Sequence, residues 1–171
     1  MIKIIITGSN GLLGQTLLNL LLKEKNKYQV FGFSKGENRS GRNNFDYFSV
    51  DITDEHQLRK SILEINPNFI INTAAMTNVD TCEKDKENCD KLNIEAVKYL
   101  MQISSEIKAH VIHISTDFIF DGEKGFYKET DSPNPLSYYG LSKLKSEEVL
   151  INSDINYTIL RTILVYGKVF D

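Results

Sequence analysis

The run Ile2-Lys3-Ile4-Ile5-Ile6-Thr7-Gly8-Ser9-Asn10-Gly11-Leu12-Leu13-Gly14 decides the fold of this chain. Its first residues are β-branched and apolar, which is typical of a buried parallel strand. Leucines recur at helical spacing from Leu12 to Leu22, so an amphipathic helix is expected to follow. A strand, a glycine turn and a helix in this order predict a turn that binds the pyrophosphate of a dinucleotide.

Each glycine of this turn has a physical task in that prediction. Gly8 lets the chain turn tightly, Gly11 lets a pyrophosphate approach the backbone, and Gly14 lets the helix pack closely on the strand. The free N–H groups and the positive dipole end of the helix then face the phosphates. The alternative is an ordinary glycine turn. The predicted phosphate-binding set is Gly8, Asn10, Gly11, Leu12, Leu13 and Gly14.

Composition places the chain among globular proteins of one domain, spanning residues 1–171. Of its 171 residues, 41% are hydrophobic and 25% charged, and the net charge of −3 gives no reason to expect nucleic acid as a partner. We expect no membrane partner, because no stretch reaches the ~20 apolar residues of a membrane span. No signal peptide is recognised, and the expected compartment is the cytoplasm. Cys82 and Cys89 fit no zinc pattern, so no metal is expected and both are predicted to be reduced, buried thiols on one face of a helix.

Strand-like stretches and helical patterns alternate along the rest of the chain. This alternation predicts an α/β fold: a Rossmann-type, doubly wound parallel sheet in the strand order 3-2-1-4-5-6, with helices on both faces. The later strands are expected at 28–33, 45–50, 69–71, 110–115 and 157–160, and the later helices at 55–66, 90–107 and 139–152.

The end of the second strand bears on which nicotinamide cofactor is bound. NAD-binding folds carry an acidic residue there for the ribose hydroxyls, but this chain has Ser34 and Lys35, followed by Arg39 and Arg42. A missing carboxylate beside cations favours the 2′-phosphate of NADP(H), with NAD(H) as the alternative. The competing interpretation is that these cations are solvated loop charges.

Two later strand ends are also predicted to contact the cofactor. Asp51, followed by Ile52, lies at the carboxyl end of the third strand, where ligands bind in open α/β sheets. Ala74 and Ala75 follow the fourth strand, and their small side chains let a cofactor lie close to the backbone.

Tyr139 and Lys143 are the predicted catalytic pair. Four residues apart in a helix, they share one face. An adjacent ammonium is expected to lower the pKa of a phenol, so that it can donate a proton to a developing alkoxide near neutral pH. His113 is expected to be a structural histidine of a buried strand, and Asn93 a solvent-facing residue.

Several motifs together resemble the dTDP-4-dehydrorhamnose reductase family of extended short-chain dehydrogenase/reductases. The run Ser115-Thr116-Asp117-Phe118-Ile119-Phe120-Asp121-Gly122 is the most specific to this family. The other matching stretches, which occur in order along nearly the whole chain, are 7–14, 51–54, 72–80, 135–143 and 160–162.

This resemblance implies roles for individual residues. Thr116 would bind the substrate carbonyl, Tyr139 would protonate its oxygen, and Lys143 would hold the nicotinamide ribose. Asp51 and Ile52 would lie by the adenine, Ala74 and Ala75 along the cleft, and Thr77 near the ribose or the substrate. The implied reaction is NADPH-dependent reduction of the 4-keto group of a dTDP-4-dehydro-6-deoxy sugar, as in dTDP-L-rhamnose and polysaccharide biosynthesis. A homodimer through the helices at 90–107 and 139–152 is also implied.

Departures from the family pattern keep other functions open. Leu164 stands where the family typically has a tryptophan beside the sugar, and Met76 where it often has tyrosine. Family members also continue beyond the point that corresponds to Asp171, into a substrate-binding part. Without that part we expect exposed apolar surface and self-association. The alternatives are another NAD(P)-dependent sugar-nucleotide epimerase or dehydratase, and a non-catalytic regulatory subunit resembling the methionine adenosyltransferase β-subunit.

Overall fold

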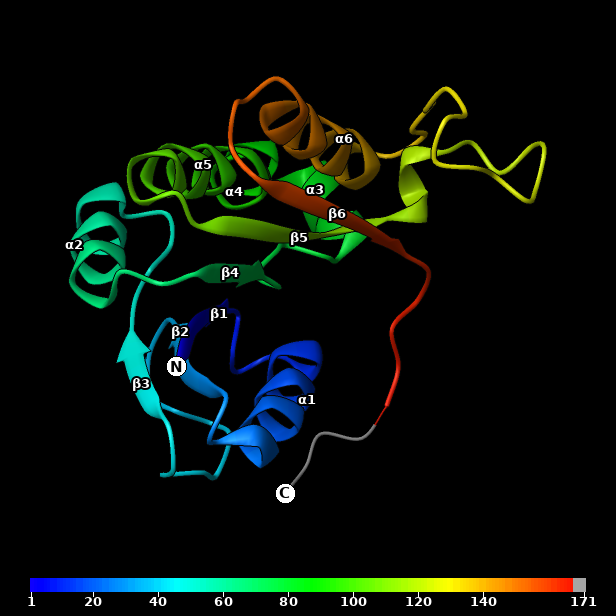
Figure 1. The fold of residues 1–171 in the computed structure, drawn as a ribbon. Coiled ribbons are helices and arrows are strands. Elements are labelled where there is room, and N and C mark those ends of the chain that lie inside the picture. The colour runs from blue at the N-terminus through cyan, green and yellow to red at the C-terminus, as the bar shows by residue number, and fades with distance from the viewer. Residues whose placement is uncertain (168–171) are drawn as a thin grey trace.

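The computed structural model describes residues 1–167, which form a six-stranded parallel sheet in the order β3-β2-β1-β4-β5-β6 (Figure 1). This is the order that the sequence predicted. The carboxyl ends of all strands point the same way, so the segments that follow them gather along one edge. The strands are β1 (Ile2–Thr7), β2 (Tyr28–Ser34), β3 (Asp46–Ser49), β4 (Phe69–Asn72), β5 (His110–Thr116) and β6 (Tyr157–Thr162).

Helices cover both faces of the sheet, but unequally. Figure 1 shows α1 on one face, and α3 to α6 on the other. The helices are α1 (Leu12–Leu21), η1 (Leu22–Glu24), α2 (Glu55–Ile65), α3 (Val79–Lys84), α4 (Lys86–Asp90), η2 (Lys91–Glu95), α5 (Ala96–Ile107), η3 (Asp117–Ile119) and α6 (Tyr138–Ile151).

Strand β1 is buried on both sides because its side chains alternate between two cores. Ile5 joins the larger core, which α2 and α5 cover with residues such as Leu58 and Leu100. Ile4 and Ile6 pack on the opposite face with Leu18 of α1. This explains why β1 reads as a continuous apolar run rather than an alternating one.

Helix α6 is unusual because the buried side of the helix is largely polar. Ser142, Lys143, Ser146 and Glu147 are all buried there, together with Gly140 and Leu150. Buried polar groups need partners: Lys143, Ser146 and Glu147 find them on β5 and β6, and Ser142 finds one on η2. The packing of α6 therefore fixes the orientation of its functional side chains as well as the fold.

The segment from 79 to 107 differs from the single helix predicted over 90–107. Helix α3 is an addition that the charged sequence did not indicate, and η2 is a π-helical segment between α4 and α5. Cys82 and Cys89 are free and buried as expected, but they lie on two helices, α3 and α4. Asp85 ends one helix and caps the next with its carboxylate, which breaks the helical face that the two thiols were expected to share.

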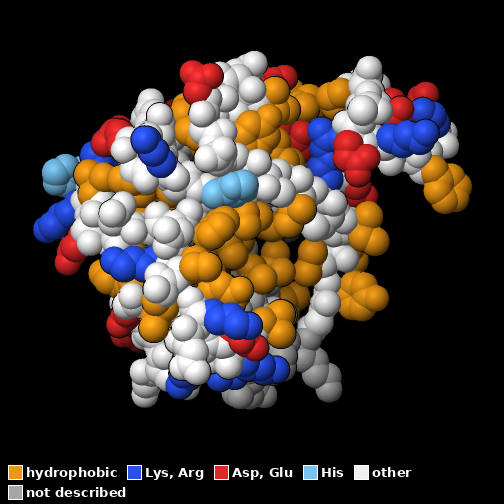
Figure 2. Space-filling view, in the orientation of Figure 1, with side chains coloured by type: hydrophobic (Ala, Val, Ile, Leu, Met, Phe, Trp, Pro, Cys, Tyr) orange, Lys and Arg blue, Asp and Glu red, His pale blue; other side chains and the backbone are white. Residues whose placement is uncertain are grey.

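Two segments expose apolar side chains. The chain after β6 presents Ile163, Leu164 and Tyr166 with exposed fractions of 73%, 80% and 87%. The loop between η3 and α6 stands out from the body of the domain and exposes Phe126 (Figure 1). Figure 2 shows hydrophobic side chains around a hollow on the face seen in that view. The expected apolar surface is present, whereas self-association and a homodimer stay predictions. None of the helices in residues 1–167 is long and apolar enough to cross a membrane.

Candidate active site

The glycine turn has the geometry that a dinucleotide site requires. Gly8 has a φ of +67°, a left-handed conformation that other residues adopt only with strain. A Cβ on Gly14 would collide with the Gly8 carbonyl oxygen, so only glycine lets α1 begin this close to the turn. Helix α1 starts at Leu12 without a side-chain cap and without an acidic residue in its first turn. The positive end of α1 is therefore available to an anion.

A cleft lies along the carboxyl edge of the sheet and consists of two adjoining hollows. One, of about 450 Å³, lies towards β2 and β3, and the other, of about 550 Å³, lies towards β5 and β6. Gly11, Thr73 and Ala75 line both hollows, so the glycine turn stands at their junction. This junction follows β1 and β4, where the strand order reverses, which is the place where such sheets bind ligands.

Every predicted catalytic and cofactor-binding residue except Arg42 lines this cleft. The hollow near β2 and β3 takes Gly8, Asn10, Gly11, Ser34, Lys35, Asp51, Ile52, Ala74 and Ala75. The hollow near β5 and β6 takes Gly11, Leu12, Leu13, Gly14, Ala75, Thr77, Thr116, Tyr139 and Lys143. The fold thus brings these residues together, and the role of each residue stays a prediction.

At the β2 end, polar contacts tie the glycine turn to the loop after β2. The Asn10 backbone N–H donates to Ser34 Oγ at 3.0 Å, and Asn10 Nδ2 donates to the Glu37 carbonyl at 2.8 Å. Lys35 Nζ donates to Asp51 Oδ2 at 2.8 Å, and this ion pair lowers the pKa of the Asp51 carboxyl. The Lys35 ammonium therefore already has a counter-ion at the place where a ribose phosphate was predicted.

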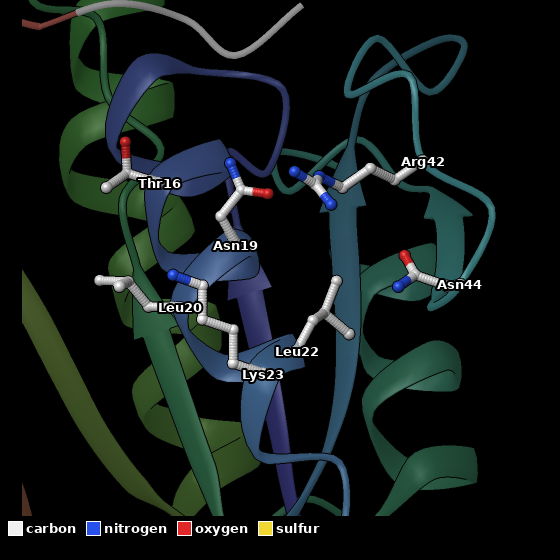
Figure 3. A pocket seen from close by; sticks show the side chains of 7 residues that line it. All are labelled: Thr16, Asn19, Leu20, Leu22, Lys23, Arg42 and Asn44. Atoms are coloured by element: carbon white, nitrogen blue, oxygen red, sulfur yellow. The ribbon is translucent and has the colours of Figure 1, made fainter.

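Arg42 does not lie at the cleft. It lines a separate hollow of about 340 Å³ together with residues of α1 and η1, and Figure 3 shows its guanidinium facing Asn19 from across that hollow. Arg39, in contrast, lines the cleft. Of the two arginines predicted to favour a 2′-phosphate, only Arg39 can contribute, because the loop after β2 directs Arg42 towards α1.

At the β5 end, Thr116 and Tyr139 face each other. Thr116 ends β5 and is 5% exposed, and its hydroxyl accepts from the Phe118 backbone N–H at 3.2 Å. Tyr139 lies in the first turn of α6, where its ring packs edge-on against Phe118 at a centroid distance of 5.8 Å. A β-strand end and a helix start thus hold the two hydroxyl groups at one side of the cleft.

The prediction that Lys143 lowers the pKa of Tyr139 is wrong for this structure. The pKa of the Tyr139 phenol is raised, chiefly because burial disfavours the phenolate; a hydrogen bond with Thr116 acts in the opposite direction. The Lys143 ammonium makes its contacts elsewhere: Nζ donates to the Ile114 carbonyl at 2.8 Å and lies 3.0 Å from His113 Nε2. Burial of Lys143 also lowers its own pKa, to about 8, against the opposing charge of Glu147.

His113 is buried, as the sequence predicted, and its partners link the sheet to the site. Burial and the Lys143 charge hold the pKa of His113 well below its usual value, so the ring is neutral. Its Nε2 lies 2.9 Å from Ser146 Oγ as well as close to Lys143, and its Nδ1 lies 3.1 Å from Asn72 Nδ2.

Asn93 was wrongly expected to face solvent. It lies on the π-helical segment η2, is 1% exposed, and accepts from the Met76 backbone N–H at 2.8 Å while donating to the Met76 carbonyl at 3.0 Å. Its Nδ2 also donates to Ser142 Oγ at 2.9 Å. Asn93 thereby connects the segment after β4 to the helix that carries Tyr139. Its place near the apolar side of the helical pattern was the only signal for this in the sequence.

Strand order, glycine turn and the Tyr139–Lys143 pair together define a Rossmann-type domain of the short-chain dehydrogenase/reductase class. Comparison with known families is more specific. The family model described as "RmlD substrate binding domain" matches residues 2–170, and the chain belongs to this family.

Individual relatives agree with this assignment. A dTDP-4-dehydrorhamnose reductase of Aggregatibacter actinomycetemcomitans is 35% identical over 98% of this chain and 53% of its own length. Methionine adenosyltransferase 2 subunit beta of Bos taurus is 30% identical over 98% of this chain and 48% of its own length. The crystal structure of dTDP-4-dehydrorhamnose reductase from Bacillus anthracis in complex with NADP superimposes with a TM-score of 0.85, at 32% identity, over 100% of this chain and 57% of that one. The chain spans about half the length of the curated relatives that it matches.

Proposed function

We propose that residues 1–171 form the cofactor-binding domain of an NADPH-dependent reductase. Its substrate would be a dTDP-4-dehydro-6-deoxy sugar, reduced at the 4-keto group as in the synthesis of dTDP-L-rhamnose. The observation that carries the proposal is that Thr116, Tyr139 and Lys143 line one end of a cleft whose other end contains Asp51 and Ser34. A dinucleotide lying across the glycine turn would span both ends.

The residues present fit a nicotinamide dinucleotide. The uncapped start of α1 suits a pyrophosphate, because its first N–H groups have no partner within the helix. Gly11 lines both hollows of the cleft and has no side chain, so a phosphate could approach its backbone closely. Ala74 and Ala75 would then lie under the middle of the cofactor.

The side chains at the β5 end can carry out a ketone reduction once NADPH supplies a hydride. The Thr116 hydroxyl would bind the carbonyl oxygen. Tyr139 would transfer its phenolic proton to that oxygen, and its raised pKa keeps the proton on the phenol at neutral pH. The Lys143 ammonium would hold the nicotinamide ribose.

The preference for NADPH rests on Lys35 and Arg39, which line the cleft near Ser34. Asp51 competes with a 2′-phosphate for the Lys35 ammonium. We therefore propose NADPH as the preferred cofactor and NADH as a weaker one. The relative from Bacillus anthracis was crystallised with NADP, in support of this choice.

Absorbance of NADPH over time, with this chain and dTDP-4-dehydro-6-deoxy-L-mannose, tests the proposal directly. Loss of the signal, faster than with NADH, is the expected result. Tight NADPH binding without turnover would contradict the claim that residues 1–171 by themselves catalyse the reduction. Conversion of another sugar nucleotide without net NADPH consumption would instead indicate an epimerase or a dehydratase.

A regulatory subunit is the second candidate, and Leu164 is the observation that favours it. This residue lines the cleft and is 80% exposed, in the position where a tryptophan is typical of the reductases. The 30% identity with methionine adenosyltransferase 2 subunit beta is consistent with this candidate. Co-purification with a synthetase, without reduction of any keto sugar, would favour it over the reductase.

A further inference from the structure

A row of buried polar side chains crosses the sheet and ends at Lys143. Register places the first three members side by side, because Asn72 of β4 pairs with Thr7 of β1 on one side and with His113 of β5 on the other. Thr7 Oγ1 donates to Asn72 Oδ1 at 2.5 Å, and Asn72 Nδ2 lies 3.1 Å from His113 Nδ1. His113 Nε2 then lies 3.0 Å from Lys143 Nζ. None of these four side chains is more than 2% exposed.

Lys143 needs such partners because its charge is buried. An ammonium group has three protons to donate, and a buried donor without an acceptor is costly. The Ile114 carbonyl accepts one proton, at 2.8 Å. His113 Nε2 is the second protein acceptor within reach, and it lies on the sheet side of the ammonium. With two protons held by β5, the third is directed into the cleft that Lys143 lines.

We propose that His113 is a positioning residue: it accepts a proton from the Lys143 ammonium at Nε2 and so aims this group at the cofactor ribose. His113 does not line the cleft and contacts no reacting atom. Its neutral state suits the task, since a protonated imidazole has no acceptor. This inference rests on the role proposed above for Lys143.

Asn72 sets the hydrogen-bond direction along the row. If Nε2 accepts, the proton of the neutral ring is on Nδ1 and must be donated to Asn72. In the structure the Asn72 NH₂ group faces His113 Nδ1 and its oxygen accepts from Thr7 Oγ1. The proposal requires the opposite orientation of this amide, with its oxygen facing His113 and its NH₂ group facing the Thr7 hydroxyl, which can accept as well as donate. The charged form of Lys143 therefore requires the Nδ1–H tautomer of His113.

Charged and titratable groups on other elements act on the same ammonium. Glu147, one turn along α6, and Cys89 of α4 both raise the pKa of Lys143, against the lowering by burial. Tyr139 of α6 lines the same hollow. The tests below leave these three groups unchanged, so any effect is assigned to His113.

The first test uses the unaltered chain and needs no activity. Long-range ¹H–¹⁵N NMR correlations of the imidazole identify the tautomer of His113 at pH 6.5, where Lys143 is charged. The expected result is the Nδ1–H tautomer. The Nε2–H tautomer at this pH would overturn the proposal, because Nε2 would then donate to Ser146 and accept nothing from Lys143.

The second test compares two substitutions of His113 whose side chains differ in length and so place their amide groups at different distances from Lys143. His113→Gln places an amide oxygen near the former Nε2, whereas His113→Asn reaches only the former Nδ1 and leaves Lys143 without this acceptor. We expect His113→Asn to lower the pKa of Lys143 by about one unit and to weaken NADPH binding about tenfold. His113→Gln should restore most of both. The pKa of Lys143 is measured by ¹³C NMR of its ε-carbon.

His110→Gln is the matched control, because His110 lies on the same strand but pairs with Thr158 on β6, at 2.9 Å. It should change neither quantity. Equal effects of His113→Asn and His113→Gln would reduce His113 to a packing role and overturn the proposal. If the unaltered chain fails to bind NADPH, the proposed function is wrong, while the tautomer and the Lys143 pKa still decide whether His113 holds Lys143.

Discussion

Arg161 of β6 and Glu147 of α6 form a fork-like ion pair: Arg161 Nη2 donates to Glu147 Oε2 at 2.7 Å and Nε donates to Oε1 at 3.1 Å. Glu147 is completely buried, and Ser115 Oγ also donates to its carboxylate. Arg161 Nη1 reaches further, to the Glu129 carbonyl at 3.1 Å in the projecting loop. The Glu147 carboxylate of α6 thus contacts both β5, through Ser115, and β6, through Arg161.

Removing the Glu147 charge should destabilise the fold. Glu147→Gln leaves the Arg161 guanidinium partly buried without its counter-ion, at an expected cost of about 3 kcal/mol in the free energy of unfolding. Urea denaturation measures this change. Glu148→Gln, at the exposed neighbouring position, is the control and should stay within ~0.5 kcal/mol of the unaltered chain. Similar midpoints for the two variants would show that the ion pair contributes little.

Tyr139→Phe should abolish reductase activity and leave NADPH binding nearly intact, because only the transferable proton is removed. Tyr138→Phe is a close control: its hydroxyl donates to Asp90 Oδ2 at 2.8 Å, and it does not line the cleft. Turnover and NADPH affinity are measured for both in a preparation that reduces the keto sugar. Unchanged turnover in Tyr139→Phe would end the proposed role of the phenol.

NADPH binding should weaken as the pH rises through about 8, the value to which burial lowers the Lys143 pKa. Below that pH the ammonium is charged in both folded and unfolded chains, and above it only the folded chain loses the proton. The contribution of Lys143 to stability therefore rises between pH 8 and the usual lysine pKa of ~10.4, while cofactor binding falls. Fluorescence titration with NADPH across pH 6.5–9.5 provides the measurement. Lys143→Arg, which stays charged, should bind more weakly but without this fall.

Two glycine substitutions should separate folding from cofactor binding. Gly14→Ala places a Cβ against the Gly8 carbonyl oxygen and should cost about 1–3 kcal/mol in stability. A Cβ on Gly11 meets that same oxygen at 3.2 Å, a tight contact that needs only a small shift, so Gly11→Ala should lose less stability than Gly14→Ala but most of its NADPH affinity. Thermal melts and NADPH titrations of both variants test this. Normal NADPH binding by Gly11→Ala would place the pyrophosphate elsewhere.

Lys35→Ala should reduce the affinity for NADPH severalfold and leave that for NADH nearly unchanged. Lys35 is largely exposed, so loss of its pair with Asp51 should change the stability little. Arg42→Ala, which removes a cation outside the cleft, is the control and should alter neither affinity. Equal losses for both cofactors in Lys35→Ala would remove the argument for a 2′-phosphate at this position.

The architecture and the position of the cleft followed from local patterns in the sequence. Apolar runs, helical spacing and the glycine turn each depend on neighbours along the chain, so the strand order and the helix after the glycine turn were predicted correctly. Tyr139 and Lys143 could be placed on one helix face for the same reason. These features need no knowledge of contacts between distant residues.

Electrostatics and long-range contacts could not be predicted in this way. The pKa of Tyr139 depends on how deeply the phenol is buried and on where the Lys143 ammonium points, and both are set by the packing of α6 on β5. Asn93 looked like a surface residue because its partner Met76 is 17 positions away in the sequence. Arg42 looked like part of a cationic group until the loop after β2 directed it towards α1.

The sequence by itself therefore determined a parallel sheet with a dinucleotide turn and a Tyr–Lys pair on one helix, because periodicity and glycine spacing act locally. Only the tertiary structure decided the charge environment of that pair. Strand register aligned Thr7, Asn72 and His113 behind Lys143, and the packing of α6 buried Glu147 against Arg161. The energy of a buried charge depends on every group around it, and those groups come from strands and helices far apart in the chain.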